Sequence, residues 1–331
     1  MLMILFLAFA LVLTFCLGFW TGFTDAAYAI STVVGTRTLK PIFAVALATA
    51  GNFVGMIFGS AVAVTIGTGI IAAEVMSGHV IVAALMGALA FDYVSSWMFS
   101  LPISETHVLV GGLIGAGLSA AGLKAIKAME IVQKVIVPMI IAPPVSLVTV
   151  LVLTLLVMRV FRKVAAPKAN RYFKRMQIVS AFFVSVTDGT NDAQKVMGIA
   201  TALLLYYGYV SEFAVPLWVT IASYATLSLG TFLGGWKIVK TMATGITRMR
   251  PYQGFCVEVG SSLILGSVAL LGLPVSSTHV ATGAIMGVGV AHRAKSVKWV
   301  NSRRIAVAWI LSIPIPAIIS FILYRIIAIA I

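Results

Sequence analysis

Two short polar segments carry residues whose types and spacing suit ligand binding. The segments LPISETHV (101–108) and LPVSSTHV (273–280) each place Ser, Thr and His after a proline, inside strongly apolar sequence. Each pattern predicts the start of a helix, because proline fits a first helical turn and Ser and Thr cap free N–H groups. Such N–H groups, the positive end of the helix dipole and hydroxyl donors together bind anions. We therefore expect an anion site made from Ser104, Thr106, Ser276, Ser277 and Thr278.

A second pair of polar segments carries acids. The segment TDAAYAI holds Asp25, and TDGTNDAQKVM holds Asp188 and Asp192. A carboxylate at the bilayer centre costs about 2.5–3.5 kcal/mol, so acids inside apolar sequence usually have a function. Carboxylate, amide and hydroxyl oxygens are hard ligands that suit Na⁺ at the ends of broken helices. Gly189 has the backbone freedom for such a break, so we expect a cation site at these segments.

Several roles in and near these segments stay open. Asp188 and Asp192 are four residues apart and share one helix face, so one of them would be protonated or ion-bound. Lys195 would either neutralise an acid or help to hold an anion. Asp188 by itself also suits a cap at the membrane interface. Glu258, in the apolar run before the second hydroxyl segment, is either a ligand or a partner for a basic residue.

Simpler interpretations account for single copies of these patterns. Ser and Thr cap many helices, and His107 and His279 would then pack against a neighbouring element. Two copies inside apolar sequence favour ligand binding. Because both histidines directly follow the threonine, they suit orienting the turn. Cys16 and Cys256 lie in apolar segments and make neither a disulfide framework nor a metal-ligand cluster, so we expect no transition metal.

The composition is that of a polytopic membrane protein. Of 331 residues, 61% are hydrophobic and 10% are charged, and the mean hydropathy is +1.09. The spans must be helical, because hydrocarbon cannot satisfy an open backbone, and the long apolar runs argue against a β-barrel. The net charge of +14 is typical of basic cytoplasmic loops, so we expect no nucleic-acid partner. The first twenty residues lack a basic start and a cleavage pattern, so we expect a retained helix.

The chain is expected to consist of two repeats. LPISETHVLVGGLIGAG and LPVSSTHVATGAIMGVG are identical at 9 of 17 positions. TDAAYAI pairs with NDAQKVM, and GMIFGSAVAVTIGTGI pairs with GTFLGGWKIVKTMATGI with one insertion. Matches in the same order indicate a duplicated unit. We place the repeats at residues 1–160 and 177–331, joined by a basic linker at 161–176.

The loop charges of the two repeats are opposite. The first acidic segment is followed by Arg37 and Lys40, whereas the second is followed by YYGYVSE, which has no basic residue. Because Lys and Arg mark cytoplasmic loops, this difference predicts inverted repeats, with the linker in the cytoplasm and both termini outside. The alternative is a parallel duplication whose charges have drifted.

Each hydroxyl segment lies between two apolar stretches. The stretches that follow, residues 108–122 and 280–291, are too short to cross a bilayer of about 30 Å. A re-entrant hairpin fits better, because irregular backbone inside the membrane is tolerated only within protein or beside a wet cavity. We therefore predict an all-α polytopic membrane protein of two inverted-topology repeats of transmembrane helices. Each would have broken helices and a re-entrant helical hairpin, and the two hairpin tips would meet near the midplane.

These motifs resemble those of the PiT family of inorganic phosphate transporters, which couple phosphate uptake to Na⁺ or H⁺. The resemblance covers nearly the whole chain. It rests on GFTDAAYAISTVVG, GTNDAQKVMG, the two P-x-S-x-T-H tips, GSAVAVTIGTGII, and GVGVAHRAKSVKWV followed by AWILSIP. It implies inverted repeats with re-entrant hairpins and a substrate site at their interface.

The resemblance also implies site residues. Phosphate would be held by Ser104, Thr106, Asn191, Gln194, Ser277 and Thr278. Sodium would be bound by Thr24, Asp25, Asn191, Asp192 and Ser276. Supporting roles would fall to Glu105, His107, Asp188, Lys195 and His279. The chain departs from the family pattern at two positions, where Thr24 replaces the usual Asn and Glu105 replaces a small residue.

The expected function is secondary active import of inorganic phosphate coupled to Na⁺, by alternating access with the anion and the cations bound near the midplane. We expect no enzymatic activity and no cofactor. The partners would be phosphate, Na⁺ and membrane lipid in the cell membrane, and a homodimer is compatible with this interpretation. The alternatives are an H⁺-coupled phosphate or sulfate permease, a channel and, more remotely, an intramembrane hydrolase. A duplicated site suits two half-sites better than one nucleophile.

Overall fold

The computed structural model describes residues 2–330, and nearly all of them are helical. No β-strand occurs in this range, although an isolated bridge pairs Ile71 with Ile126. Seven of the described helices are long and apolar enough to cross a membrane, or up to eight spans if the bent pair of α9 and α10 is counted as one. The expected all-α polytopic membrane protein is confirmed.

The two repeats contain corresponding helices in the same order. The first comprises α1 (Leu2–Gly35), α2 (Pro41–Val54), α3 (Ala61–Thr68), α4 (Gly78–Asp92), α5 (Glu105–Ala121), α6 (Ala128–Ile131) and α7 (Val137–Val160). The second comprises α8 (Ala166–Tyr206), α9 (Leu217–Leu233), α10 (Trp236–Gly245), α11 (Pro251–Leu270), α12 (Ser277–His292), α13 (Trp299–Leu311) and α14 (Pro314–Ala330). The expected linker is helical for most of its length, since residues 166–176 form the first turns of α8.

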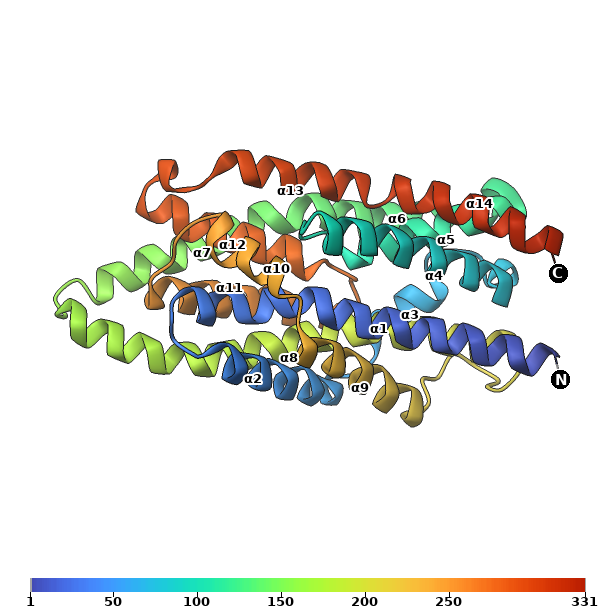
Figure 1. Cartoon of the computed structure of the whole chain (residues 1–331), viewed down its shortest axis with the longest axis horizontal. Helices are drawn as coiled ribbons and strands as arrows, with labels where there is room; N and C mark the ends of the chain where they lie inside the picture. Colours follow the sequence, from blue (N-terminus) through green and yellow to red (C-terminus); the bar gives the residue numbers. More distant parts are fainter. Residues whose placement is uncertain (1, 331) are drawn as a thin grey trace.

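The two repeats run in opposite directions. In Figure 1, α1 runs from right to left, whereas its counterpart α8 runs from left to right. α7 ends at the left, where α8 begins, and α14 ends at the right, near the start of α1. Corresponding helices make equivalent contacts across the two repeats. α12 packs against α7 as α5 packs against α14, and α9 packs against α1 as α2 packs against α8. The expected inverted repeat is confirmed, and each repeat completes the other.

Each repeat contains a helical hairpin whose tip lies inside the molecule. The first hairpin is formed by α4 and α5, and the second by α11 and α12. α5 has 17 residues and α12 has 16. Each is therefore about 24–26 Å long, shorter than the hydrocarbon core of about 30 Å. The hairpins approach from opposite ends of the molecule (Figure 1), which is the arrangement expected of re-entrant elements.

Broken helices are present, but not at either acidic segment, and α1 runs without a break through Asp25. α9 and α10 are bent by 73°, and a 3-10 turn at Gly55–Phe58 follows α2. α8, in contrast, is continuous through the acidic segment, so the expected break at Gly189 is wrong. The reason is packing. A Cβ on Gly189 would lie 2.5 Å from the Cα of Asn52, so the glycine lets α2 touch α8.

Two apolar clusters enclose a layer of polar residues. One cluster includes Val33 of α1 and Val184 of α8, and the other includes Leu17 and Leu203 of the same two helices. The acidic segments lie between these positions along both helices. Apolar packing therefore separates the polar layer from the water at both ends of the molecule.

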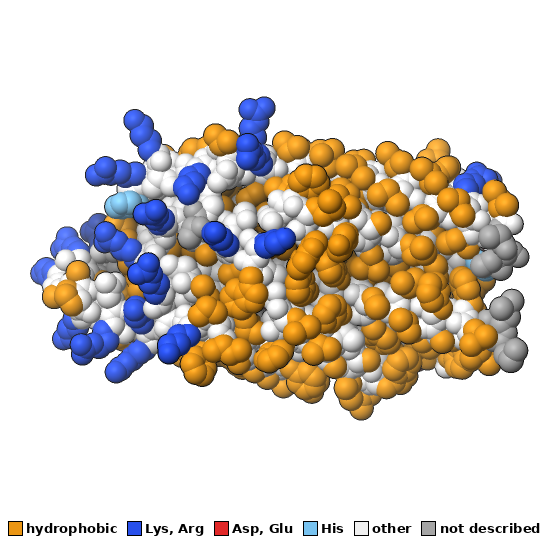
Figure 2. All heavy atoms as spheres, viewed as in Figure 1, with side chains coloured by type: hydrophobic (Ala, Val, Ile, Leu, Met, Phe, Trp, Pro, Cys, Tyr) orange, Lys and Arg blue, Asp and Glu red, His pale blue; other side chains and the backbone are white. Residues whose placement is uncertain are grey.

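Lys and Arg residues gather at one end of the molecule (Figure 2). This end contains the junction between α7 and α8, where Arg159, Arg162, Lys163 and Lys168 are exposed. α1 begins and α14 ends at the opposite end (Figure 1). The positive charge is thus concentrated at one end of the axis along which the helices run.

Candidate functional site

The tips of the two hairpins touch each other. The hydroxyl of Thr278 donates a hydrogen bond to the carbonyl of Ile103, 2.8 Å away. The rings of His107 and His279 meet edge to face with centroids 4.7 Å apart, and His279 stacks on Trp309 at 3.7 Å. These side chains are buried. The histidines therefore hold the two tips against each other and against α13.

Serine occupies the N-cap position of both returning helices, and only Ser104 makes a capping hydrogen bond with its side chain. Ser104 is the N-cap of α5, and its hydroxyl accepts a hydrogen bond from the N–H of His107 at 3.3 Å. Ser276 is the N-cap of α12, and its hydroxyl lies 2.7 Å from that of Thr278. Both helices thus point their N-terminal ends at the place where the tips meet.

The prolines of the tips lie outside the helices. Pro102 and Pro274 precede the serine caps by two residues, so the expectation of a proline in the first helical turn is wrong. A capping serine keeps a non-helical backbone, and the helix begins only after it. Pro102 belongs to the irregular tip, where its carbonyl accepts a hydrogen bond from the indole N–H of Trp309 at 3.2 Å.

The acidic segment of α1 contacts both tips. The carboxylate of Asp25 accepts a hydrogen bond from Ser277 at 3.2 Å. The neighbouring hydroxyl of Thr24 donates to the carboxylate of Glu105 at 2.9 Å. Asp25 of α1 therefore contacts the second tip, and Thr24 of α1 contacts the first tip.

The acidic segment of α8 contacts the second tip and contains a lysine that pairs with one of its own acids. The amide of Asn191 donates a hydrogen bond to the carbonyl of Val275 at 2.5 Å. Lys195 forms a buried ion pair with Asp192, one turn earlier on the same helix. A buried ion pair has a high desolvation cost, so its position beside the tips favours a functional role over a purely stabilising one.

α8 also contacts the interrupted end of α2 and α3. The side-chain oxygen of Gln194 accepts a hydrogen bond from the N–H of Val62, in the first turn of α3, at 2.7 Å. Asp188 lies on α8 four residues before Asp192 and is buried as well. The structure thus places all of the expected site residues in the polar layer or at its border.

Several buried polar atoms in this layer have no hydrogen-bond partner among the described residues. They include two donors, the hydroxyl of Thr106 and the amide nitrogen of Gln194. They also include acceptor oxygens of Asp188, Asn191 and Asp192. A buried group without a partner costs about 1–3 kcal/mol, so a concentration of them indicates a ligand site. The donors suit an oxyanion, and the acceptors suit a cation.

The structure adds an acid that the sequence analysis did not single out. Asp92, at the end of α4, is 0% exposed and accepts a hydrogen bond from Ser96 at 2.6 Å. The signal was available, because an acid in the apolar stretch before the first hydroxyl segment deserves the same weight as Asp25.

Glu258 has polar partners and no basic one among the described residues. Its carboxylate accepts hydrogen bonds from Thr32 at 2.5 Å, Gln177 at 3.1 Å and Ser180 at 2.5 Å. These residues belong to α1, α8 and α11. The geometry gives Glu258 a role in joining three helices on the linker side of the tips.

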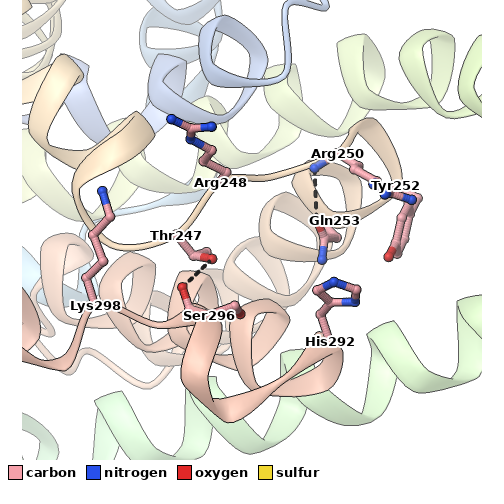
Figure 3. Close-up of a pocket in the computed structure, with 8 residues that line it drawn as sticks. All are labelled: Thr247, Arg248, Arg250, Tyr252, Gln253, His292, Ser296 and Lys298. Atoms are coloured by element: carbon pink, nitrogen blue, oxygen red, sulfur yellow. Dashed lines mark hydrogen bonds between the residues drawn. The ribbon is translucent and has the colours of Figure 1, made fainter.

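Two hollows of different character flank these residues. A narrow cavity beside the tips is lined, among others, by Thr24, Asp25, Ser96, Glu105 and Thr278. A wider, open hollow at the basic end carries Arg248, Arg250 and Lys298 (Figure 3). A hydrogen bond of 3.2 Å from Thr247 to the Ser296 carbonyl joins its two sides. Because the wider hollow lacks the buried acids and the hairpin tips, the narrow cavity marks the candidate transport site.

Comparison with known proteins agrees with this architecture. Residues 21–320 match the phosphate transporter family. The chain belongs to this family. It is 42% identical over 308 residues to a probable low-affinity inorganic phosphate transporter of Rhizobium meliloti (strain 1021), with 92% of each chain covered. It is 36% identical to the protein of the same name from Bacillus subtilis (strain 168), again with 92% of each chain covered.

A solved structure has the same fold. That structure, described as the sodium-dependent phosphate transporter, matches with a TM-score of 0.89 at 24% identity, covering 98% of this chain and 100% of the other. The chain is therefore a phosphate transporter of the PiT family and a multi-pass membrane protein. It is not an enzyme, and the hydrolase alternative is excluded.

Proposed function

We propose that this chain imports inorganic phosphate together with Na⁺, binding both where the hairpin tips meet. The observation that carries the proposal is the direct contact of the tips, from Thr278 to Ile103 at 2.8 Å, inside a polar layer built by both repeats. A site shared by two inverted repeats changes its accessible side when one repeat moves against the other.

Phosphate would bind at the starts of α5 and α12. Hydroxyl groups and two helix N-termini converge there, and amide groups of α8 lie nearby; the proposed ligands are Ser104, Thr106, Asn191, Gln194, Ser277 and Thr278. Lys195 is the one Lys or Arg that is buried within residues 2–330, and it already pairs with Asp192. Anion binding would therefore depend mainly on hydroxyl donors and helix dipoles.

Sodium would bind beside the phosphate, between α1, α8 and the second tip. The proposed ligands are the side chains of Thr24, Asp25, Asn191, Asp192 and Ser276. Support comes from the side-chain oxygens of Asn191 and Asp192 that lack a partner in the described chain. The solved structure with the same fold is described as the sodium-dependent phosphate transporter, which favours Na⁺ as the coupling ion.

Charge balance explains why cations would accompany the anion. Asp25, Asp188 and Asp192 are buried in the polar layer, with Lys195 as the opposite charge. Phosphate adds further negative charge, and the membrane potential opposes its entry by about 2.3 kcal/mol per charge per 100 mV. Bound cations offset the repulsion in the site and, if their charge exceeds that of phosphate, reverse the effect of the potential.

The experiment that tests the proposal is phosphate uptake into proteoliposomes containing the purified full chain. An inward Na⁺ gradient and a matched inward H⁺ gradient would be compared, for the parent and for Asp192→Asn. We expect Na⁺ to drive accumulation and the variant to lose it, because an amide cannot supply the ligand charge. Glu212→Gln, in the exposed loop between α8 and α9, is the control and should transport at the parent rate.

Two outcomes would contradict this assignment. Accumulation driven by H⁺ alone would show that the acids carry protons and that sodium coupling is wrong. Uptake of sulfate with no uptake of phosphate would leave the site in place but change its substrate.

A further inference from the structure

We propose that the hollow at the basic end is a second phosphate site, which binds free phosphate on the side expected to face the cytoplasm and slows further uptake when it is filled. It is the hollow drawn in Figure 3, and it is separate from the transport site at the hairpin tips. Its effect on uptake rests on the proposed function, whereas its binding of phosphate does not.

The side chains that line this hollow are all polar. Arg248, Arg250 and Lys298 carry positive charge, and no Asp or Glu lies among the described residues of the walls. The ion pairs of the described chain lie elsewhere, so neither arginine has a carboxylate partner within residues 2–330. The positive charge in the hollow is therefore not neutralised by an acid of the chain.

The general excess of Lys and Arg at this end does not explain the hollow. Basic residues mark a cytoplasmic surface wherever they stand on it, as Arg159 and Arg162 do at the α7–α8 junction. Two other hollows, one beside Arg37 and one beside Arg304, have apolar side chains on their walls. The hollow of Figure 3 differs from both, because its walls combine positive charge with hydroxyl, amide and imidazole groups.

These groups suit a phosphate ion. A guanidinium group donates two parallel N–H bonds to a phosphate, and hydroxyl and imidazole groups supply further donors. In Figure 3, Lys298 lies on one side of the view and His292 on the other, with Arg248 between them. The hollow has a volume of about 430 Å³, within the range of about 300–1,000 Å³ that is typical of small-molecule sites. It therefore has room for a phosphate group and the water around it.

The polar walls favour free phosphate over the headgroup of an anionic lipid. Both present the same phosphate chemistry, and basic pockets between membrane helices bind such headgroups. A lipid also brings acyl chains, which need apolar surface beside the headgroup, and the lining of this hollow has no apolar side chain. Free phosphate is also the ion that import releases on this side.

The hollow lies at the base of the second hairpin, between the start of α11 and the end of α12. Tyr252 belongs to the first turn of α11, and His292 is the last residue of α12. The positive dipole end of α11 and the negative dipole end of α12 oppose each other here, so the charged side chains determine the sign of the site. The hollow is therefore positive because of its arginines and lysine.

The two segments that form the walls are already joined by hydrogen bonds. Thr247 donates to the carbonyl of Ser296 at 3.2 Å, and the N–H of Lys298 donates to the carbonyl of Ile246 at 3.0 Å. A phosphate ion held by both segments would add to this connection. It would tie together the base of the hairpin whose tip carries the proposed phosphate ligands of α12.

This connection gives the site its effect on transport. Alternating access requires one repeat to move against the other, and a ligand that binds one conformation better shifts the population toward it. Phosphate that accumulates on the basic side would fill the hollow and hold the hairpin in one conformation. Uptake would then slow as the phosphate concentration on that side rises.

The first test measures phosphate binding without sodium. Radiolabelled phosphate would be bound to the purified full chain in detergent, at constant ionic strength and with choline in place of Na⁺. We expect saturable binding that is weaker by about tenfold or more in the double variant Arg248→Gln, Arg250→Gln, because bonds to charged donors are lost. The control is Arg159→Gln, Arg162→Gln, which removes the same charge from exposed positions at the same end and should bind like the parent.

Three outcomes of this test would overturn the site. They are no binding by the parent, equal binding by the parent and Arg248→Gln, Arg250→Gln, and equal weakening in the control. The last would show only a general attraction of phosphate to the basic end.

A second measurement does not depend on the stability of the arginine variant. His292→Cys, at the hollow, and Lys168→Cys, outside it, would each be made in the background Cys16→Ala, Cys256→Ala and treated with a thiol reagent. We expect phosphate without Na⁺ to slow the modification of His292→Cys and to leave that of Lys168→Cys unchanged. A rate at His292→Cys that does not respond to phosphate would contradict the site.

Reconstitution distinguishes free phosphate from a lipid headgroup. The sodium-free binding assay would be repeated in nanodiscs of phosphatidylcholine, with and without phosphatidylglycerol, at a salt concentration that screens the lipid charge. We expect equal binding in both. Loss of binding in the presence of phosphatidylglycerol would assign the hollow to the lipid headgroup and overturn free phosphate as its ligand.

The effect on transport is measured in proteoliposomes. The initial rate of Na⁺-driven phosphate uptake would be compared with and without preloaded phosphate, for the parent and for Arg248→Gln, Arg250→Gln. Preloaded phosphate also competes at the transport site, but it does so in both proteins, so the difference isolates the hollow. We expect the parent to be slowed more than the variant, and equal slowing would overturn the regulatory effect. Failure of the parent to accumulate phosphate with Na⁺ would contradict the proposed function, whereas sodium-free binding would still report on the hollow.

Discussion

Glu258 illustrates how one buried carboxylate joins helices that are distant in the sequence. Glu258→Ala would leave two buried donors unpaired, on Thr32 and Gln177, and the Ser180 hydroxyl would keep only its bond of 3.3 Å to the Gln177 carbonyl. Each unpaired group costs about 1–3 kcal/mol. We therefore expect a loss of several kcal/mol, seen as a Tm in detergent lower by at least several degrees. Glu258→Gln should lose less, because its amide oxygen still accepts hydrogen bonds.

The matched control for this prediction is Glu212→Ala, which removes an exposed acid and should leave the Tm within error. A Glu258→Ala protein as stable as the parent would show that water or a rearranged neighbour replaces the carboxylate. The network would then contribute nothing to holding α1, α8 and α11 together.

The site residues can be recognised from the sequence only in part. Polar residues inside apolar runs are costly, so Asp25, Asp192 and the hydroxyl tips are recognisable without a structure. Their pairings cannot be recognised in this way, because a local sequence pattern carries no information about the distant residue that it contacts. Thr24 lies 81 positions from Glu105, and Asp25 lies 252 positions from Ser277. Only the folded arrangement brings them together.

At the scale of elements, glycine decides how closely helices approach. A Cβ on Gly22 of α1 would collide with the carbonyl oxygen of Leu227 on α9. Overpacking of a closely packed contact costs typically about 1–3 kcal/mol. We expect Gly22→Ala to lower the Tm in detergent and the fraction of monodisperse protein. Gly266→Ala on α11 is the control, because its Cβ would meet a side-chain methyl at an ordinary 3.5 Å.

An unchanged Gly22→Ala protein would mean that α1 and α9 separate easily, and that the repeats are held together elsewhere.

Close contact between helices also explains why the expected break at Gly189 is wrong. Glycine in a membrane helix permits either a break or a close approach, and the local sequence looks the same for both. The neighbouring helix decides, and Asn52 of α2 occupies the space beside Gly189.

At the scale of the whole molecule, charge and repeat symmetry specify one orientation. Duplicated motifs and alternating loop charges predict inverted repeats, and the antiparallel course of α1 and α8 confirms them (Figure 1). The side of the membrane on which each end lies follows from a separate argument. Lys and Arg gather at the end that holds the α7–α8 junction (Figure 2), and because an excess of these residues is typical of the cytoplasmic side, we propose that this end faces the cytoplasm.

Single cysteines would test this orientation in a background of Cys16→Ala and Cys256→Ala. We expect a membrane-impermeant maleimide to label Glu212→Cys in intact cells, because the loop between α8 and α9 lies at the end away from the basic residues. Lys168→Cys, in the first turns of α8, should react only after permeabilisation. The reversed pattern would place both termini in the cytoplasm and contradict the orientation inferred from the charge, whereas the direction of transport would still follow the Na⁺ gradient. Labelling of both positions from one side would contradict the fold, since α8 carries them to opposite ends of the molecule.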